Sequence, residues 1–179
     1  MGQNIWKDGV FGLIVGDALG VPVEFSSREE CEHNPVIGMR AYGTHNQPAG
    51  TWSDDSSMAL ATLDSIKQKG KIDYKDLMDK FTEWCLYADY TPFHEVFDIG
   101  VATSRAIIQY GKGTDPIDCG GKTEWDNGNG SLMRILPVCL YLYNRQKMIC
   151  TSENESIYLI HNVSALTHAH LRSQIACGI

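Results

Sequence analysis

One stretch of the sequence reads Gly50-Thr51-Trp52-Ser53-Asp54-Asp55-Ser56-Ser57-Met58, and it opens a segment with a clear helical pattern. The segment 54–69 carries apolar residues on one face, ends with Lys67 and Lys69, and stops at Gly70. Acidic residues at the start, basic residues at the end and a glycine just beyond are the expected order along a helix. We therefore predict a helix over 54–69 whose first turn carries two adjacent carboxylates.

Similar patterns cover most of the remaining chain. The most regular is the segment 73–87, where Asp73 can serve as N-cap and apolar residues recur at the i, i+3, i+4, i+7 spacing of an amphipathic helix. Further helices are predicted over 3–20, 98–110, 130–143, 153–166 and 168–179. We predict an all-α fold, a compact single-domain helical bundle over residues 1–179.

Glycines, an aspartate and a proline add detail to these predicted helices. The four glycines from Gly9 to Gly20 fall at helical spacing, and each weakens a free helix by about 1 kcal/mol relative to alanine, so close backbone packing is the expected compensation. Asp98 stands where the following helix should begin. Pro137 is expected to bend a central helix that is apolar nearly all round.

Composition excludes several classes of protein. With 179 residues, 43% hydrophobic and 21% charged, the chain suits one soluble globular domain. No apolar run is long enough to cross a bilayer and the start lacks a signal-peptide pattern, so we expect no membrane partner and a cytoplasmic location. Fifteen Lys+Arg against 22 Asp+Glu give a net charge of −7 without a basic cluster, which disfavours nucleic acid. Six scattered cysteines predict reduced thiols.

Two features of the predicted helices and loops indicate binding of a metal ion and of a ligand. Ser53, Asp54 and Asp55 offer only oxygen ligands, which suit Mg²⁺ or Mn²⁺, although serine and aspartate are also the commonest helix caps. The long connection 111–129 leads into Asn127-Gly128-Asn129-Gly130-Ser131, where bare backbone can present amides to an anion or a ribose. A glycine-rich loop with Ser131 as a cap explains that turn equally well.

Four ordered blocks of the sequence resemble the ADP-ribosylglycohydrolase family, particularly its bacterial dinitrogenase-reductase-activating branch. The blocks are 16–25, 50–59, 127–134 and 167–170, which span nearly the whole chain. The resemblance implies an all-α fold and hydrolysis of the bond between ADP-ribose and a protein side chain, most typically arginine. It also implies a cleft with two Mg²⁺ or Mn²⁺ ions.

The resemblance further implies a role for each matching residue. Ser53, Asp54 and Asp55 would ligate the metals, and Glu24 matches an acidic residue that approaches the metal site, although alone it reads as a solvated glutamate. Asp126, together with Asp54 and Asp55, is our candidate for proton transfer.

The remaining matching residues would bind the substrate. Asn129, Gly130 and Ser131 would line the ribose and phosphate pocket, with His168 near the nucleotide. A histidine in such a helical region is more often a core or cap residue, so His168 depends on the resemblance, and His170 does so more weakly.

One part of the family pattern is missing. Relatives complete the metal site with a late Asp-x-Asp-Thr block, which this sequence lacks, and the chain ends in the apolar run 174–179. We therefore expect the N-terminal portion of the family domain, whose exposed apolar C-terminal helix would favour oligomers. Three interpretations stay open: a glycohydrolase that acts on ADP-ribosylated protein, an inactive remnant that binds ADP-ribose weakly, or a helical interaction module.

Overall fold

The computed structural model describes residues 4–148 and 153–179, and its regular structure within these ranges is helical. The helices are α1 (Ile5–Gly20), α2 (Arg28–His33), α3 (Asp54–Lys69), α4 (Tyr74–Tyr87), α5 (Val101–Gly111), α6 (Leu136–Met148), α7 (Glu153–Ala165) and α8 (Leu171–Gly178), with the 3-10 turns η1 (Val21–Val23), η2 (Pro116–Asp118) and η3 (Glu124–Asp126). The described ranges hold no strand, only two isolated β-bridges. The predicted all-α fold is confirmed.

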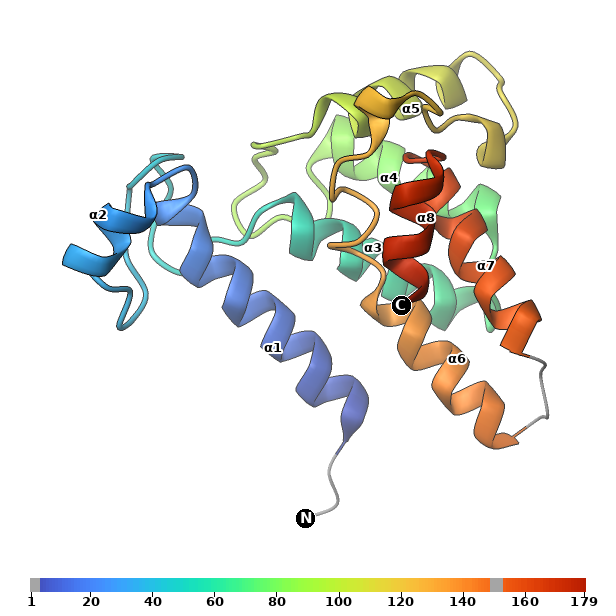
Figure 1. The fold of residues 1–179 in the computed structure, drawn as a ribbon, viewed down its shortest axis with the longest axis horizontal. Helices are drawn as coiled ribbons and strands as arrows, with labels where there is room; N and C mark the ends of the chain where they lie inside the picture. The colour runs from blue at the N-terminus through green and yellow to red at the C-terminus, as the bar shows by residue number, and fades with distance from the viewer. Residues whose placement is uncertain (1–3, 149–152) are drawn as a thin grey trace.

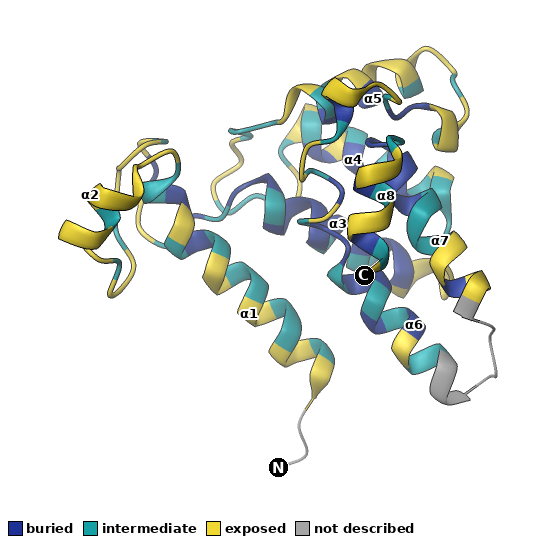
Figure 2. Cartoon of the chain, in the orientation of Figure 1, coloured by how far each residue is buried: buried dark blue, intermediate teal, exposed yellow. Residues whose placement is uncertain are grey.

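The core lies where α3, α4, α6 and α7 meet, as the dark blue segments of Figure 2 show. The side chains in it that are exposed by 1% or less include Met58, Phe81, Trp84, Val138 and Leu166. α8 packs on α7, and α1 packs on α3 and α6 from one side of this group (Figure 1). Burial of these apolar side chains supplies the main stabilisation of the fold.

The two most regular sequence segments form helices with the predicted bounds. α3 begins after the N-cap Ser53 and ends at Gly70, whose φ of 67° is the left-handed conformation typical of a glycine that ends a helix. The side chain of Asp73 caps α4 by accepting a hydrogen bond from the N–H of Asp76 at 3.1 Å. Local capping contacts are thus present where the sequence predicts these helix ends.

Three predicted helix starts are wrong. α8 begins at Leu171, three residues after the expected start, with His170 as its N-cap. α5 begins at Val101 with Gly100 as N-cap, three residues after the expected start, and Asp98 has a φ of 56°. α6 begins at Leu136, so Pro137 lies in its first turn and does not bend it. Proline is favoured there because the first N–H groups of a helix need no intrahelical acceptor. Residues 130–134 form turns instead of the predicted helix.

The predicted packing of the α1 glycines is wrong for most of them. A methyl group added at Gly12, Gly16 or Gly20 would meet no other atom within 4 Å. Gly9 alone comes close to α6, where a methyl group would lie 3.6 Å from Leu140. α1 is therefore partly uncovered, and Phe11 and Val15 are exposed on it.

Long connections around these helices contain short ordered elements. The predicted loop 22–52 includes α2, which starts with a capping box between Ser27 and Glu30. The loop 111–129 includes η2 and η3 and pairs with the segment before α8 through the Gly121–His168 bridge. This pairing brings the glycine-rich turn next to His168.

The five cysteines within the described residues are free: Cys31, Cys85, Cys119, Cys139 and Cys177. Cys150 lies outside the described residues. None of the described helices combines the length and the apolar character that a membrane span requires.

Candidate active site

The first turn of α3 is held by Asp17 from α1. The Asp17 carboxylate accepts hydrogen bonds from the backbone N–H groups of Ser53 and Ser56, each at 3.0 Å, and from their hydroxyls at 2.8 and 2.6 Å. These backbone groups are among those that an isolated helix leaves without partners. Asp17 thus fixes the start of α3, and with it the direction of the two acidic side chains that follow.

Asp54 and Asp55 form the acidic side of the site. Burial raises the pKa of Asp54 to about 8, and the charges of Asp55, Asp98 and Asp17 contribute in the same direction. Burial also raises the pKa of Asp55, followed by the charge of Asp17. Carboxylates that are buried together repel one another when ionised, and a bound cation relieves that repulsion. With the Ser53 hydroxyl 3.2 Å from Asp55 Oδ2, this oxygen donor set fits a hard divalent cation.

A cavity of about 320 Å³ opens beside these carboxylates, within the size range of small-molecule sites. Six of the residues predicted from the sequence line it: Glu24, Asp54, Asp55, Asn129, Gly130 and His168. A second hollow, of about 350 Å³, shares Glu24, Asp55 and Asn129 with it and reaches Asp17 and Ser53. Residues from four distant parts of the sequence therefore meet at one place.

A larger hollow of about 720 Å³ lies elsewhere, between the start of α4 and the residues that follow α5. It contains none of the predicted site residues. Size alone therefore does not select the candidate site, and we select it by the convergence of the predicted side chains.

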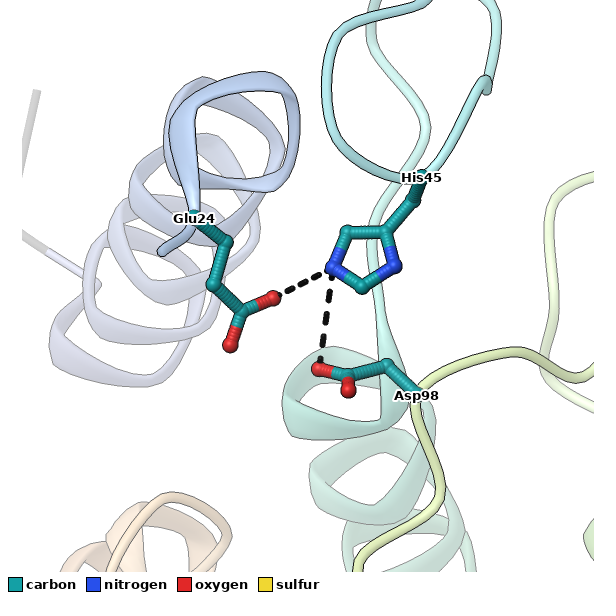
Figure 3. A group of neighbouring side chains, drawn as sticks. All are labelled: Glu24, His45 and Asp98. Carbon is teal, nitrogen blue, oxygen red and sulfur yellow. Dashed lines mark hydrogen bonds and ion pairs between the residues drawn. The ribbon is translucent and has the colours of Figure 1, made fainter. Parts of the chain in front are cut away.

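Glu24 and Asp98, which line the cavity, form a cluster with His45 (Figure 3). His45 Nε2 lies 2.6 Å from Glu24 Oε2 and 4.0 Å from Asp98 Oδ2. Burial raises the pKa of Asp98, and the neighbouring Glu24 raises it further. The ligand atoms of the three side chains lie within 4.8 Å of one another, close enough to hold a metal ion. His45 thereby connects the loop after α1 to the segment before α5.

Asp126, predicted to handle protons, does not line the cavity, and its carboxylate is bonded within its own loop. Its Oδ2 accepts hydrogen bonds from the N–H and hydroxyl of Thr123, at 3.0 and 2.6 Å. These bonds, the side-chain bond first, lower the pKa of Asp126. A carboxylate whose ionised form is stabilised in this way is a weak base. The geometry gives Asp126 a structural role in the loop and no support as the catalytic base.

Ser131 and His170 also lie apart from the cavity lining. Ser131 is fully buried, and its hydroxyl lies 2.9 Å from Ser164 Oγ and accepts a hydrogen bond from Cys177 Sγ at 3.4 Å. His170 is the N-cap of α8, and its Nδ1 accepts from the N–H of Arg172 at 3.2 Å. Ser131 thus links its turn to α7 and α8, and His170 caps α8.

Sequence reasoning assigned no site role to Asp17, His45 or Asp98. Asp17 carried a signal, because an acidic residue in the last turn of a helix opposes the helix dipole and so suggests a partner elsewhere. The sequence pattern places Asp98 at a helix start, and its left-handed backbone cannot be predicted from local sequence. No pattern marked His45.

Comparison with known proteins settles the family. The profile of the ADP-ribosylglycohydrolase family matches residues 6–179. The chain belongs to this family. Among curated ADP-ribosylglycohydrolase relatives, it is 31% identical to the ADP-ribosylarginine hydrolase Tri1 of Pseudomonas putida (strain GB-1), over 90% of this chain and 41% of that protein. It is also 31% identical to the ADP-ribosyl-[dinitrogen reductase] glycohydrolase of Rhodospirillum rubrum, over 93% of this chain and 52% of that protein.

A solved structure named ADP-ribosylglycohydrolase-related protein complex has the same fold. It superposes with a TM-score of 0.68 at 32% identity, over 94% of this chain and 50% of that chain. The chain thus spans about half the length of the ADP-ribosylglycohydrolases it matches.

Proposed function

We propose that the cavity binds the ADP-ribose part of an ADP-ribosylated protein and serves hydrolysis of the bond that joins ADP-ribose to an arginine side chain. The observation that carries this proposal is the convergence of the acidic residues Asp54, Asp55 and Glu24 with Asn129, Gly130 and His168 around one cavity. The relatives support the linkage, since one is named as an ADP-ribosylarginine hydrolase. The partner is then an ADP-ribosylated protein or ADP-ribose itself.

Mg²⁺ or Mn²⁺ would be held by Ser53, Asp54 and Asp55, whose oxygens suit either ion. When bound, such a cation supplies a Lewis acid and lowers the pKa of a coordinated water. The raised pKa values of Asp54 and Asp55 support this assignment, because both carboxylates are costly to keep ionised without a cation.

Glu24 is the proposed proton-handling carboxylate. It lines the cavity, and its Oε2 lies 2.6 Å from His45 Nε2. Asp98 stands beside it, with a pKa raised by burial and by Glu24. A carboxyl group beside the reacting bond can donate or accept a proton, as acid–base catalysis requires.

Release of ADP-ribose from ADP-ribosylarginine protein, with Mg²⁺ or Mn²⁺ present, tests the hydrolase proposal. We expect turnover by the wild-type chain and its loss in Asp54→Asn and Asp55→Asn. Asp118→Asn is the matched control, because Asp118 is exposed and forms a surface ion pair with Lys122. Equal turnover in all four proteins would contradict the proposed role of the α3 carboxylates.

Binding is measured separately, because the chain spans about half the length of its relatives. Titration calorimetry with Mn²⁺ and then with ADP-ribose distinguishes the three interpretations of the sequence. Binding with turnover supports a hydrolase, and ADP-ribose binding without turnover supports a non-catalytic domain. Absence of both leaves the helical interaction module. Loss of one metal-ligating carboxylate should weaken Mn²⁺ binding by at least about tenfold, the scale seen even for second-sphere residues.

A further inference from the structure

A buried arginine lies behind the His168 wall of the cavity. Arg134 has an exposed fraction of 0%. Its Nη2 donates hydrogen bonds to the carbonyl of Val163 at 3.2 Å and to the hydroxyl of Thr167 at 2.8 Å, while Nε donates to the carbonyl of Gly130 at 3.1 Å. None of these partners is charged. Nη1 has no hydrogen-bond partner among the described residues. Burial of a charge without a charged partner lowers stability. We therefore infer that this arginine has a role other than stabilising the fold.

The direction of the hydrogen bonds around Thr167 follows from the chemistry of arginine. A guanidinium can only donate, so the Thr167 hydroxyl accepts from Arg134. Thr167 is itself fully buried, and its other side-chain partner is His168 Nδ1 at 2.8 Å. If Nδ1 donated to this hydroxyl instead, the buried hydroxyl proton of Thr167 would have no acceptor among the described residues, so we assign that proton to the hydrogen bond with Nδ1. A neutral imidazole whose Nδ1 accepts a hydrogen bond carries its proton on Nε2.

The opposite edge of the His168 ring lies at the cavity. A methyl group added at Gly130 would lie 3.1 Å from Nε2 and 2.6 Å from Cε1, and one added at Gly128 would lie 3.6 Å from Nε2. The missing side chains of these two glycines thus leave room for the ring. The backbone of His168 is fixed as well, because its N–H donates to the carbonyl of Ser164 at 2.8 Å and its carbonyl accepts from Ser164 Oγ at 2.9 Å.

We propose that Arg134 and Thr167 are positioning residues that fix His168 as a neutral Nε2–H donor to an oxygen of the bound ADP-ribose. The identity of this ligand rests on the proposed function, whereas the state of His168 rests on the hydrogen bonds alone. Burial, and then the charge of Arg134, lower the pKa of His168 to about 4, against the opposite effect of Asp126. His168 then offers a donor without adding a positive charge next to the acidic side of the cavity.

The state of His168 can be measured without any substrate. Long-range ¹⁵N–¹H NMR on the full chain labelled at histidine reports which ring nitrogen carries the proton, and His168→Gln identifies the signal. We expect the Nε2–H tautomer at pH 7. A proton on Nδ1, or a charged ring at that pH, would overturn the proposal.

The link to substrate is tested with Thr167→Val, which removes the hydroxyl, and Thr167→Ser, which keeps it. Loss of the fixed tautomer should weaken ADP-ribose binding by about five- to tenfold in Thr167→Val, roughly the value of one hydrogen bond, while Thr167→Ser stays within about twofold of wild type. The NMR signal should show a mixed tautomer only in Thr167→Val. Wild-type affinity together with an unchanged tautomer in Thr167→Val would overturn the positioning role.

Two further outcomes remain decisive. Should Thr167→Val not fold, the wild-type tautomer and the ADP-ribose affinity of Thr167→Ser still test the assignment. Serine keeps the hydroxyl, so weaker ADP-ribose binding by Thr167→Ser would contradict a role for the hydroxyl. Should the wild-type chain bind no ADP-ribose, the proposed function and the ligand assigned here fail together, while the tautomer still decides the roles of Arg134 and Thr167.

Discussion

The Asp17 carboxylate receives four hydrogen bonds from the first turn of α3, two from backbone N–H groups and two from hydroxyls. Asparagine has nearly the same shape but carries two donors in place of one acceptor oxygen. Asp17→Asn should therefore lower the free energy of unfolding by about 3 kcal/mol, as expected when buried polar groups lose a charged acceptor. Urea unfolding followed by circular dichroism measures the change.

The control for this variant is Asp8→Asn, since Asp8 is an exposed aspartate in the first turn of the same helix. It should change stability by less than about 0.5 kcal/mol, as is usual for surface substitutions. A loss in Asp17→Asn no larger than that of the control would show that α1 does not fix the start of α3.

The pKa of Asp54 predicts how stability depends on pH in buffers without divalent cations. The carboxyl keeps its proton up to about pH 8 in the folded protein, against an ordinary value of 3.8. Between these values the folded state binds more protons than the unfolded state, so the free energy of unfolding falls as pH rises. Asp54→Asn should make this slope shallower, as measured by urea unfolding at several pH values.

Asp118→Asn again serves as control and should keep the wild-type slope. The same slope in Asp54→Asn and wild type would mean that the α3 start tolerates an ionised Asp54. The interpretation of the site as a cation site would then lose its electrostatic support.

α1 contains glycines that the packing around the helix does not require. Gly12 lies in the interior of the helix with open space around its α-carbon. Gly12→Ala should raise the free energy of unfolding by about 0.5–1 kcal/mol, because alanine restricts the unfolded chain and favours the helix. Thermal and urea unfolding measure this gain.

Gly43→Ala provides the contrast for the same substitution in a loop. Gly43 has a φ of 30°, and an added methyl group would collide with the backbone of Pro22. This variant should be destabilised. Stabilisation of both variants, or of neither, would contradict the packing described for α1 and for the loop after it.

Helix ends show which elements local sequence can predict. α3 and α4 start and stop as expected, because Ser53, Gly70 and Asp73 satisfy the helix ends through their own side chains or backbone. α5 and α6 start later than expected, since Asp98 and the turn before Pro137 are held by contacts with distant residues. Periodicity cannot distinguish such a turn from a helix.

Across the whole molecule, apolar side chains remain exposed on α8, with Leu171 at 62% and Ile175 at 45%. Exposed apolar side chains of this kind favour association. We expect concentration-dependent self-association in sedimentation velocity, reduced by the double variant Leu171→Gln, Ile175→Gln.

The matched control is Phe11→Gln, Val15→Gln on α1, where the exposed apolar surface is comparable. If only the α1 variant reduced association, the contact surface would be α1 and not α8. A monomer at every concentration would contradict the prediction altogether.

The sequence by itself determined the all-α fold, the bounds of α3 and α4, and six residues of the cavity, because helical periodicity, caps and the four family blocks are local signals. Tertiary structure alone decided that Asp17 holds α3, that His45 and Asp98 join Glu24, and that Asp126 and Ser131 turn inward. These choices depend on which distant groups meet and on which polar atoms lose water. Such pairings between residues far apart along the chain leave no periodic pattern in the sequence.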